Sequence, residues 1–342
     1  MLNEINWAYL KKRVGSFLKR RVMVSPVSVI VPVYNSEDTM RKCLDSLIDQ
    51  SQKRIRIICV NDGSSDRTLE ILKEYKRRYW KIKIINQKNG GRSAARNSGL
   101  NAVRTKFVMF CDSDDWYEKE MCENMVDAIE KSRADLAVCG LNMIYKAHEE
   151  MKESDEEYYK IRFNGLKEID DEIILTTDSS VCNKIFRTEI IKKHNICFPD
   201  GLNNEDFYFY NAYMSVAKSI YFVDQRLYNY IRHEGSIMSS NFAADKKSLD
   251  HLIVAEKLFN FYKKTGFLKQ HKDLFWRQWI ASFWFSYRSS DKKYYSQIGK
   301  EARRFLNDYF EEYRPSESEL IKWKDDIVKT INKIGKDKNG RK

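Results

Sequence analysis

Three carboxylates follow a short apolar segment in the stretch KFVMFCDSDDW, residues 106–116. Asp112, Asp114 and Asp115 lie within four positions, so their charges repel one another, and burying them without partners would be costly. Hard divalent cations take oxygen ligands and keep coordination positions open for substrate phosphates. The spacing therefore indicates a cation site beside a phosphate-bearing ligand, whereas a solvated acidic turn is the simpler alternative.

Similar polar clusters follow three earlier apolar segments, at residues 28–34, 54–60 and 82–85. These clusters are Tyr34 with Asn35, then Asp62, then Gly90 to Arg92. Helical patterns separate the apolar segments. They lie at 38–50, from the cap at Ser65 or Asp66 through 79, at 93–103 and at 118–132, and a fifth strand is expected at 134–139. Strands that alternate with helices predict an α/β domain with a mostly parallel sheet. Because ligands bind beyond the carboxyl ends of such strands, we expect the four clusters to share one cleft.

Two common nucleotide-binding patterns are missing from the sequence. No GxGxxG follows the first strand and no P-loop is present, which disfavours a dinucleotide-binding fold and a P-loop enzyme. Residues 141–180 are polar and weakly patterned, so we expect loops there. Further on, Glu205 and Asp206 precede an aromatic helix at 207–216, where the helix dipole stabilises negative charge, so a structural role is open for both.

The two ends of the chain are expected to be helical. From residue 241 on, the pattern is helical, and apolar residues between Trp276 and Tyr287 recur at helical spacing, which favours a core over a membrane contact. Residues 5–22 combine Trp7 and other apolar residues with six basic ones, which predicts a basic amphipathic helix. That helix either contacts a membrane surface or docks on the protein itself.

Charge and composition narrow the class of protein. The 342 residues carry a net charge of +12, of which residues 1–25 contribute +5 and residues 241–342 contribute +9, so the middle is close to neutral. Basic ends suit an anionic membrane surface, and they argue against a nucleic-acid enzyme, which would place basic residues around its cleft. No apolar stretch approaches eighteen residues and no apolar block follows the basic N-terminus, so we expect neither a membrane span nor a signal peptide.

The cysteines and histidines indicate neither disulfides nor a zinc site. The seven cysteines are scattered without a CxxC pair, and the five histidines lack metal-ligand spacing. We therefore expect reduced cysteines in the core of a cytoplasmic protein, held peripherally at the inner face of the cell membrane by its basic ends.

An ordered set of motifs resembles the signature of the family-2 glycosyltransferases, which are inverting enzymes with the nucleotide-diphospho-sugar transferase fold. The motifs are VSVIVPVYN (27–35), VNDGSSD (60–66), NGGRSAARNSGL (89–100), FCDSDDW (110–116), CNKIFR (182–187), NED (204–206) and HEGSIMSS (233–240). The similar enzymes are bacterial and build capsular, lipopolysaccharide or teichoic-acid-type glycans. The resemblance implies a Rossmann-like catalytic domain at 26–240, between the basic helix in 1–25 and a helical domain at 241–342.

The resemblance also implies roles for individual residues. The donor-binding residues would be Pro32, Val33, Tyr34, Asp62, Arg92, Asp112, Ser113 and His233, with Asp62 on the base, for which uracil is the usual case. Asp114 would coordinate Mn²⁺ or Mg²⁺ on the diphosphate, and Asp206 would be the base that takes the proton of the acceptor hydroxyl. Residues near the acceptor or supporting the site would be Lys184, Glu205 and Arg232. Asn61 departs from the pattern, because many members carry an Asp there.

The implied activity is metal-dependent transfer of a hexose or N-acetylhexosamine, with inversion, from a nucleotide sugar (UDP in the usual case) to a hydroxyl of a cell-surface glycan or a lipid-linked acceptor. Two alternatives remain open. A non-catalytic sugar-nucleotide-binding or scaffold protein could share the fold. A sugar-1-phosphate nucleotidyltransferase would need a Gly-rich basic loop after the first strand, and PVYNSED is not such a loop. The C-terminal helices also offer a surface for a homodimer.

Overall fold

The computed structural model describes residues 26–147, 150–154, 162–232 and 249–339. The basic helix expected at 5–22, the donor residue His233 and the expected domain boundary at 240 therefore lie outside the described residues.

Ten strands of the described residues form a single sheet. They are β1 (Val27–Val33), β2 (Ile55–Asn61), β3 (Ile82–Asn86), β4 (Phe107–Phe110), β5 (Trp116–Tyr117), β6 (Leu136–Ala147), β7 (Glu150–Ser154), β8 (Gly165–Glu168), β9 (Lys184–Arg187) and β10 (Ser219–Arg232). The strand order is β3-β2-β1-β4-β9-β6-β10-β5, with β7 on β6 and β8 on β10. Because β1, β2, β3 and β4 pair in parallel, their carboxyl ends share one edge, as the sequence predicts.

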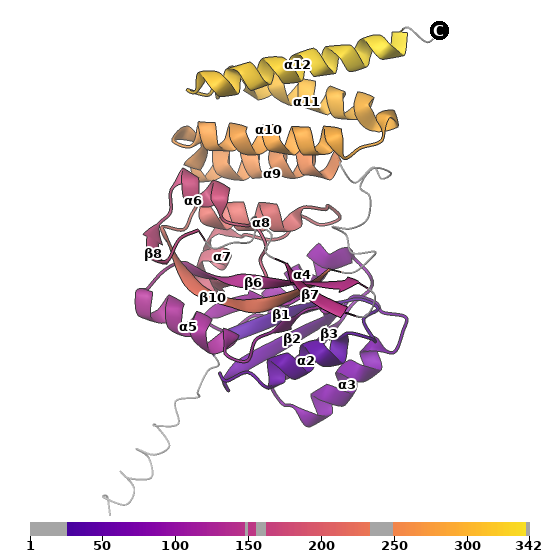
Figure 1. Cartoon of the computed structure of the whole chain (residues 1–342), viewed down its shortest axis with the longest axis vertical. Helices are drawn as coiled ribbons and strands as arrows, with labels where there is room; N and C mark the ends of the chain where they lie inside the picture. The colour runs from indigo at the N-terminus through magenta and orange to yellow at the C-terminus, as the bar shows by residue number, and fades with distance from the viewer. Residues whose placement is uncertain (1–25, 148–149, 155–161, 233–248, 340–342) are drawn as a thin grey trace, which may run out of the picture.

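Helices cover the sheet and then continue as a separate stack. They are α2 (Met40–Ile48), α3 (Thr68–Arg78), α4 (Gly91–Ala102), α5 (Met121–Ser132), α6 (Asp171–Thr176), α7 (Thr188–His194), α8 (Glu205–Met214), α9 (Asp250–Thr265), α10 (Lys272–Arg288), α11 (Tyr295–Tyr309) and α12 (Ser318–Asn339). Short 3₁₀ turns lie at Phe267–Lys269 and Lys292–Tyr294. Figure 1 shows α8 between the sheet and the α9–α10 pair, with α11 and α12 farther out. The sheet domain and the helical C-terminal region are thus both present.

The expectation of loops at 141–180 is wrong in part. Strand β6 runs on to Ala147, and β7, β8 and α6 occupy much of the rest. Strand β10 likewise continues past the expected end at 223, through a register shift between Val223 and Tyr228. The three residues in this irregular stretch, 224–226, are exposed and polar. Because these polar residues break the apolar pattern, the full length of the strand cannot be recognised from apolar periodicity in the sequence.

The aromatic stripe of α10 lies in the core, as expected. Trp276, Trp279 and Phe283 are at most 1% exposed, and Trp276 and Trp279 pack edge to face with ring centroids 5.5 Å apart. Six of the seven cysteines are buried and none is paired, whereas Cys197 is exposed. Among the residues that the structure describes, no helix combines the length and the apolar character that a membrane crossing needs.

Helix α4 lies very close to β1, and Gly99 permits this approach. A Cβ atom built at Gly99 would lie 2.5 Å from Cγ2 of Ile30, a buried residue of β1. Any side chain here would therefore push α4 away from the strand. The position matters for the site because α4 also carries Arg92 and Arg96.

We expect Gly99→Ala to lower the free energy of unfolding by about 1–3 kcal/mol, because the added methyl overpacks the α4–β1 contact. Chemical denaturation with an unchanged m-value would measure this loss. The matched control is Asn101→Ala on the exposed side of the same helix, which we expect to stay within about 0.5 kcal/mol of the parent. Equal stability of the two variants would contradict the packing argument.

Candidate active site

A cavity of about 1440 Å³ opens at the carboxyl ends of the parallel strands. Ten of the residues expected at the site line it: Pro32, Val33, Tyr34, Asp62, Arg92, Asp112, Ser113, Asp114, Glu205 and Asp206. They come from β1, from the segments after β2 and β4, and from helices α4 and α8. The expectation that the polar clusters share one cleft is therefore confirmed. Two other expected residues, Lys184 and Arg232, are not among the lining residues.

Asp62 organises the loop that leads into α4. Its Oδ1 accepts hydrogen bonds from Nε2 of Gln87 (2.8 Å) and from the backbone N–H of Gly90 (2.9 Å), and its Oδ2 accepts one from the N–H of Gly91 (2.8 Å). A carboxylate oxygen has more than one lone pair, so Asp62 keeps acceptor capacity toward the cavity. Asn61 is instead buried, with its Nδ2 2.5 Å from Oδ1 of Asn86 across the β2–β3 pair.

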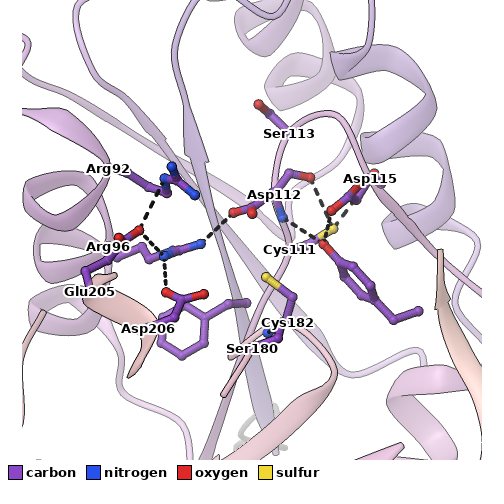
Figure 2. Close-up of polar contacts among 12 residues, drawn as sticks. Arg92, Arg96, Cys111, Asp112, Ser113, Asp115, Ser180, Cys182, Glu205 and Asp206 are labelled. Atoms are coloured by element: carbon purple, nitrogen blue, oxygen red, sulfur yellow. Dashed lines mark hydrogen bonds and ion pairs between the residues drawn. The ribbon is translucent and has the colours of Figure 1, made fainter. Parts of the chain in front are cut away.

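Arg96 connects the two acidic clusters. Its Nη2 lies 2.8 Å from Oδ1 of Asp112, and its Nη1 lies 3.1 Å from Oε1 of Glu205 and 2.5 Å from Oδ1 of Asp206. Its side chain is fully buried. Figure 2 shows the guanidinium between Asp112 on one side and Glu205 with Asp206 on the other. The planar fork of arginine suits such a bridge because its donors point in fixed, divergent directions.

Arg96 was not among the residues expected at the site. It lies inside the motif NGGRSAARNSGL, and it follows Arg92 by four residues, so both arginines face the same side of α4. The sequence could have indicated its role, because Arg96 lies on the face of a helix that packs on a buried strand. A charge in such a place needs acidic partners. Arg92, expected at the donor, lies 3.3 Å from Oε1 of Glu205 and lines the cavity.

The three carboxylates after β4 have different partners. Asp112 pairs with Arg96; burial alone would raise the pKa of Asp112, but the charges of Arg96 and Arg92 bring it below its usual value. Asp115 is 1% exposed, and its oxygens accept from the Tyr228 hydroxyl (2.5 Å) and the Ile231 N–H (2.8 Å). Burial and the charges of Asp114 and Asp112 raise the pKa of Asp115. The hydrogen bonds of Asp115 therefore connect the segment after β4 to β10. Asp112 and Asp114 remain as the candidate cation ligands.

These residues fit a cation that is shared with a ligand. Within the described part of the chain, no three His, Cys, Asp or Glu side chains lie close enough together to enclose a metal ion. Mg²⁺ and similar cations are commonly held by one or two carboxylates together with substrate phosphates and water. Asp112 and Asp114 offer such a partial set of oxygen ligands at the cavity wall.

Asp206 is the carboxylate with the chemistry of a base. It lies in the first turn of α8, and burial raises its pKa to about 6, against the opposing charge of Arg96 and with a further increase from Glu205. A base is most effective when its pKa lies near the working pH. The preceding residue, Asn204, has a left-handed backbone (φ 65°), a conformation that asparagine tolerates better than most residues. The helix start thus places Asp206 at the cavity through an uncommon turn.

Lys184 lies in the core. It is fully buried on β9, with its Nζ 2.7 Å from the Ser180 carbonyl oxygen and 3.2 Å from Oδ1 of Asp178. Ser180 and Cys182 in this loop line the cavity. The sequence left two roles open for Lys184, acceptor contact and packing. Its buried position favours packing, in which its contacts to Ser180 and Asp178 hold the loop that lines the cavity.

We expect Arg96→Ala to lower the free energy of unfolding by about 3–5 kcal/mol, because it leaves buried and half-buried carboxylates without their counter-charge. Urea denaturation monitored by fluorescence would measure the loss. Arg77→Ala, which removes an exposed arginine of α3, is the control and should change stability by less than about 0.5 kcal/mol. A similar small effect for Arg96→Ala would show that the bridge contributes little.

Comparison with known proteins identifies a family domain within the chain. The sequence profile described as glycosyl transferase family 2 matches residues 28–194. A putative glycosyltransferase of Bacillus subtilis, EpsH, is 34% identical over 225 residues, and the match covers 62% of this chain and 62% of EpsH. The match thus spans less than two thirds of the length of that relative.

Solved structures share the fold at low identity. Residues 1–349 of Staphylococcus aureus TarS, solved in complex with UDP-GlcNAc, superpose with a TM-score of 0.59 and 22% identity, covering 91% of each chain. The mannosyltransferase PcManGT of Pyrobaculum calidifontis, solved with GDP-Man and Mn²⁺, gives a TM-score of 0.52 and 11% identity, covering 96% of this chain and 93% of that one. The profile match identifies a glycosyl transferase family 2 domain over residues 28–194, and the solved structures share the fold.

Proposed function

We propose that this chain is an inverting glycosyltransferase that moves a hexose or N-acetylhexosamine from a UDP sugar to a hydroxyl group of a cell-surface glycan or a lipid-linked acceptor. The observation that carries the proposal is the cavity that Asp62, Asp114 and Asp206 line together, although they come from three distant parts of the chain. Family membership supports the reaction type, and the TarS complex with UDP-GlcNAc supports the choice of donor.

The donor would bind at the carboxyl ends of β1, β2 and β4. Tyr34 is 51% exposed at the cavity and offers an aromatic surface to the base, and Asp62 offers acceptor oxygens to it. Asp112, Ser113 and Arg92 would contact the ribose and the phosphates. Ser113 is fixed for this by a hydrogen bond of 2.8 Å between its hydroxyl and that of Ser36.

A divalent cation fits beside this donor. Asp114, with Asp112 next to it, would hold Mn²⁺ or Mg²⁺, which would neutralise charge on the leaving diphosphate. The PcManGT complex with GDP-Man and Mn²⁺ supports this choice of ion.

The transfer would be a single displacement. The acceptor oxygen forms a bond to the anomeric carbon as the bond from that carbon to the diphosphate oxygen breaks, and Asp206 takes the hydroxyl proton. Arg96 holds Oδ1 of Asp206 at 2.5 Å and so fixes the carboxylate, whose second oxygen can accept the proton. The products are a glycoside with inverted configuration and a nucleoside diphosphate, with the proton on Asp206.

The test of the function is a screen of nucleotide sugars with Mn²⁺ that records release of the nucleoside diphosphate. We expect release from a UDP sugar and loss of release with a chelator. Asp206→Asn should lower turnover by about 10²–10⁴-fold, because it removes the base, while the Kd for UDP, measured by calorimetry, stays the same.

Asp224→Asn is the matched control for this screen, because it changes an exposed carboxylate of β10 that does not line the cavity. It should turn over like the parent. Near-normal turnover of Asp206→Asn would exclude Asp206 as the base, and no release from any nucleotide sugar would exclude the function itself.

The pH profile of transfer should report the ionisation of Asp206. Because burial raises its pKa to about 6 and only the ionised form accepts a proton, we expect kcat/KM to fall about tenfold for each pH unit below that value. Initial rates between pH 4.5 and 8 would measure this. A flat profile down to about pH 4.5, with the protein still folded, would contradict the role of Asp206.

The expectations about the environment of the protein stay predictions. They are a cytoplasmic location, contact of the basic N-terminal segment with an anionic membrane surface, and pairing of two copies through the C-terminal helices. The division of the chain into a basic helix, a catalytic domain and a helical domain is likewise a prediction.

A further inference from the structure

The cavity extends beyond the region that matches the family profile and reaches the C-terminal helices. Its far side is lined by His251 of α9, by Gln278, Ala281, Ser282 and Phe285 of α10, and by Ser289 directly after α10, a set that we call the α10 wall. The four α10 residues recur at helical spacing and so share one face of that helix, and Ser289 follows at its C-terminal end. Pockets for one small ligand usually have roughly 300–1,000 Å³, so a cavity of about 1440 Å³ has room for a second ligand beside the donor.

Two hydrogen bonds fix the α10 wall relative to the proposed base. Nε2 of the buried Gln278 lies 2.7 Å from Oδ1 of Asn211, which belongs to α8, the helix that begins beside Asp206. At the start of α8, the N–H of Asn203 donates to Oδ2 of Asp250 at the start of α9 (2.9 Å). These two hydrogen bonds join α8, which carries Asp206, to α10 and to the start of α9, and Figure 1 shows α8 next to the α9–α10 pair.

The chemistry of the wall is neutral and partly aromatic. Phe285 is 38% exposed, and the ring of His251 packs on it with centroids 4.1 Å apart. Burial lowers the pKa of His251 to about 4, so the imidazole is uncharged near neutral pH. Arg92, at the donor end, is the only Lys or Arg among the described residues that line the cavity. A phosphate or carboxylate on the wall would therefore meet no described cationic side chain.

We propose that the α10 wall is the acceptor subsite and that it takes an uncharged sugar residue, with the apolar face of the pyranose ring on Phe285. This inference rests on the proposed function, because a single displacement requires the acceptor to approach from the side opposite the leaving diphosphate. Asp206 lies in the first turn of α8, and Figure 1 shows α8 between the sheet and the α9–α10 pair. The proposed base thus lies on the helix between the strand ends, where the donor would bind, and the helices that carry the wall. Ser289 supplies a hydroxyl beside the ring, whereas the Ser282 hydroxyl donates to the Gln278 carbonyl oxygen and can only accept from a ligand.

The experiment measures acceptor-dependent release of UDP from the donor that the screen identifies. The probes are methyl glycosides of glucose, galactose, N-acetylglucosamine and N-acetylgalactosamine, with ribitol 5-phosphate as the charged polyol. We expect a methyl glycoside to act as acceptor. Phe285→Ala should raise its KM by about tenfold, whereas the KM for the donor stays the same, because only the acceptor loses a stacking surface.

Two variants make the result specific. Phe285→Tyr keeps the ring and should restore the acceptor KM, which a general loss of folding would not allow. Trp80→Ala removes a 69% exposed tryptophan that does not line the cavity, and it should leave both KM values unchanged.

Three results would overturn the inference while leaving the proposed function intact. They are an unchanged acceptor KM in Phe285→Ala, use of ribitol 5-phosphate in preference to every methyl glycoside, and donor hydrolysis without use of any methyl glycoside. Absence of donor hydrolysis in the parent protein would instead remove the proposed function, and this inference with it.

Discussion

The buried guanidinium of Arg96 is the constraint on which the site depends. Three carboxylates, Asp112, Glu205 and Asp206, lie within 3.1 Å of it. Without a central cation, this arrangement would combine the repulsion of like charges with the cost of burying them. Arg96 therefore allows the end of β4 and the start of α8 to meet in one cavity, and it opposes the burial that raises the pKa of Asp206. The ion pairs of Arg96 therefore stabilise the fold and also hold the proposed base in position.

Much of the parallel sheet could be predicted from the sequence, because the first four strands are mostly apolar segments that end in turns. The polar residues after these runs fall at one sheet edge, so Tyr34, Asp62 and Asp112 could be placed together from the order of elements alone. Strand β10 was underestimated because its polar, irregular stretch interrupts the apolar pattern. The bridge by Arg96 was missed because the contact joins residues 109 or more positions apart, Arg96 with Glu205 and Asp206.

The C-terminal helices complete the site in a way that no motif indicates. The profile match ends at residue 194, yet the cavity wall continues through residues 203–207 to α10. The same helix buries Trp276 and Trp279 in the core and turns Phe285 toward the cavity. Apolar residues at helical spacing predict which side chains of α10 pack in the core. The function of its other face depends on which elements lie opposite that face in the folded protein. In this chain, α8 and the sheet edge lie across the cavity from the face of α10 that carries Phe285.

The central claim is that the donor lies at the strand ends with its anomeric carbon toward Asp206. A crystal structure of the Asp206→Asn variant with Mn²⁺ and the nucleotide sugar would test this claim most directly. We predict density for the diphosphate and the ion beside Asp112 and Asp114, the base beside Tyr34 and Asp62, and the sugar on the side of α8. Density for the nucleotide outside this cavity, or for the sugar on the side away from α8, would contradict the account.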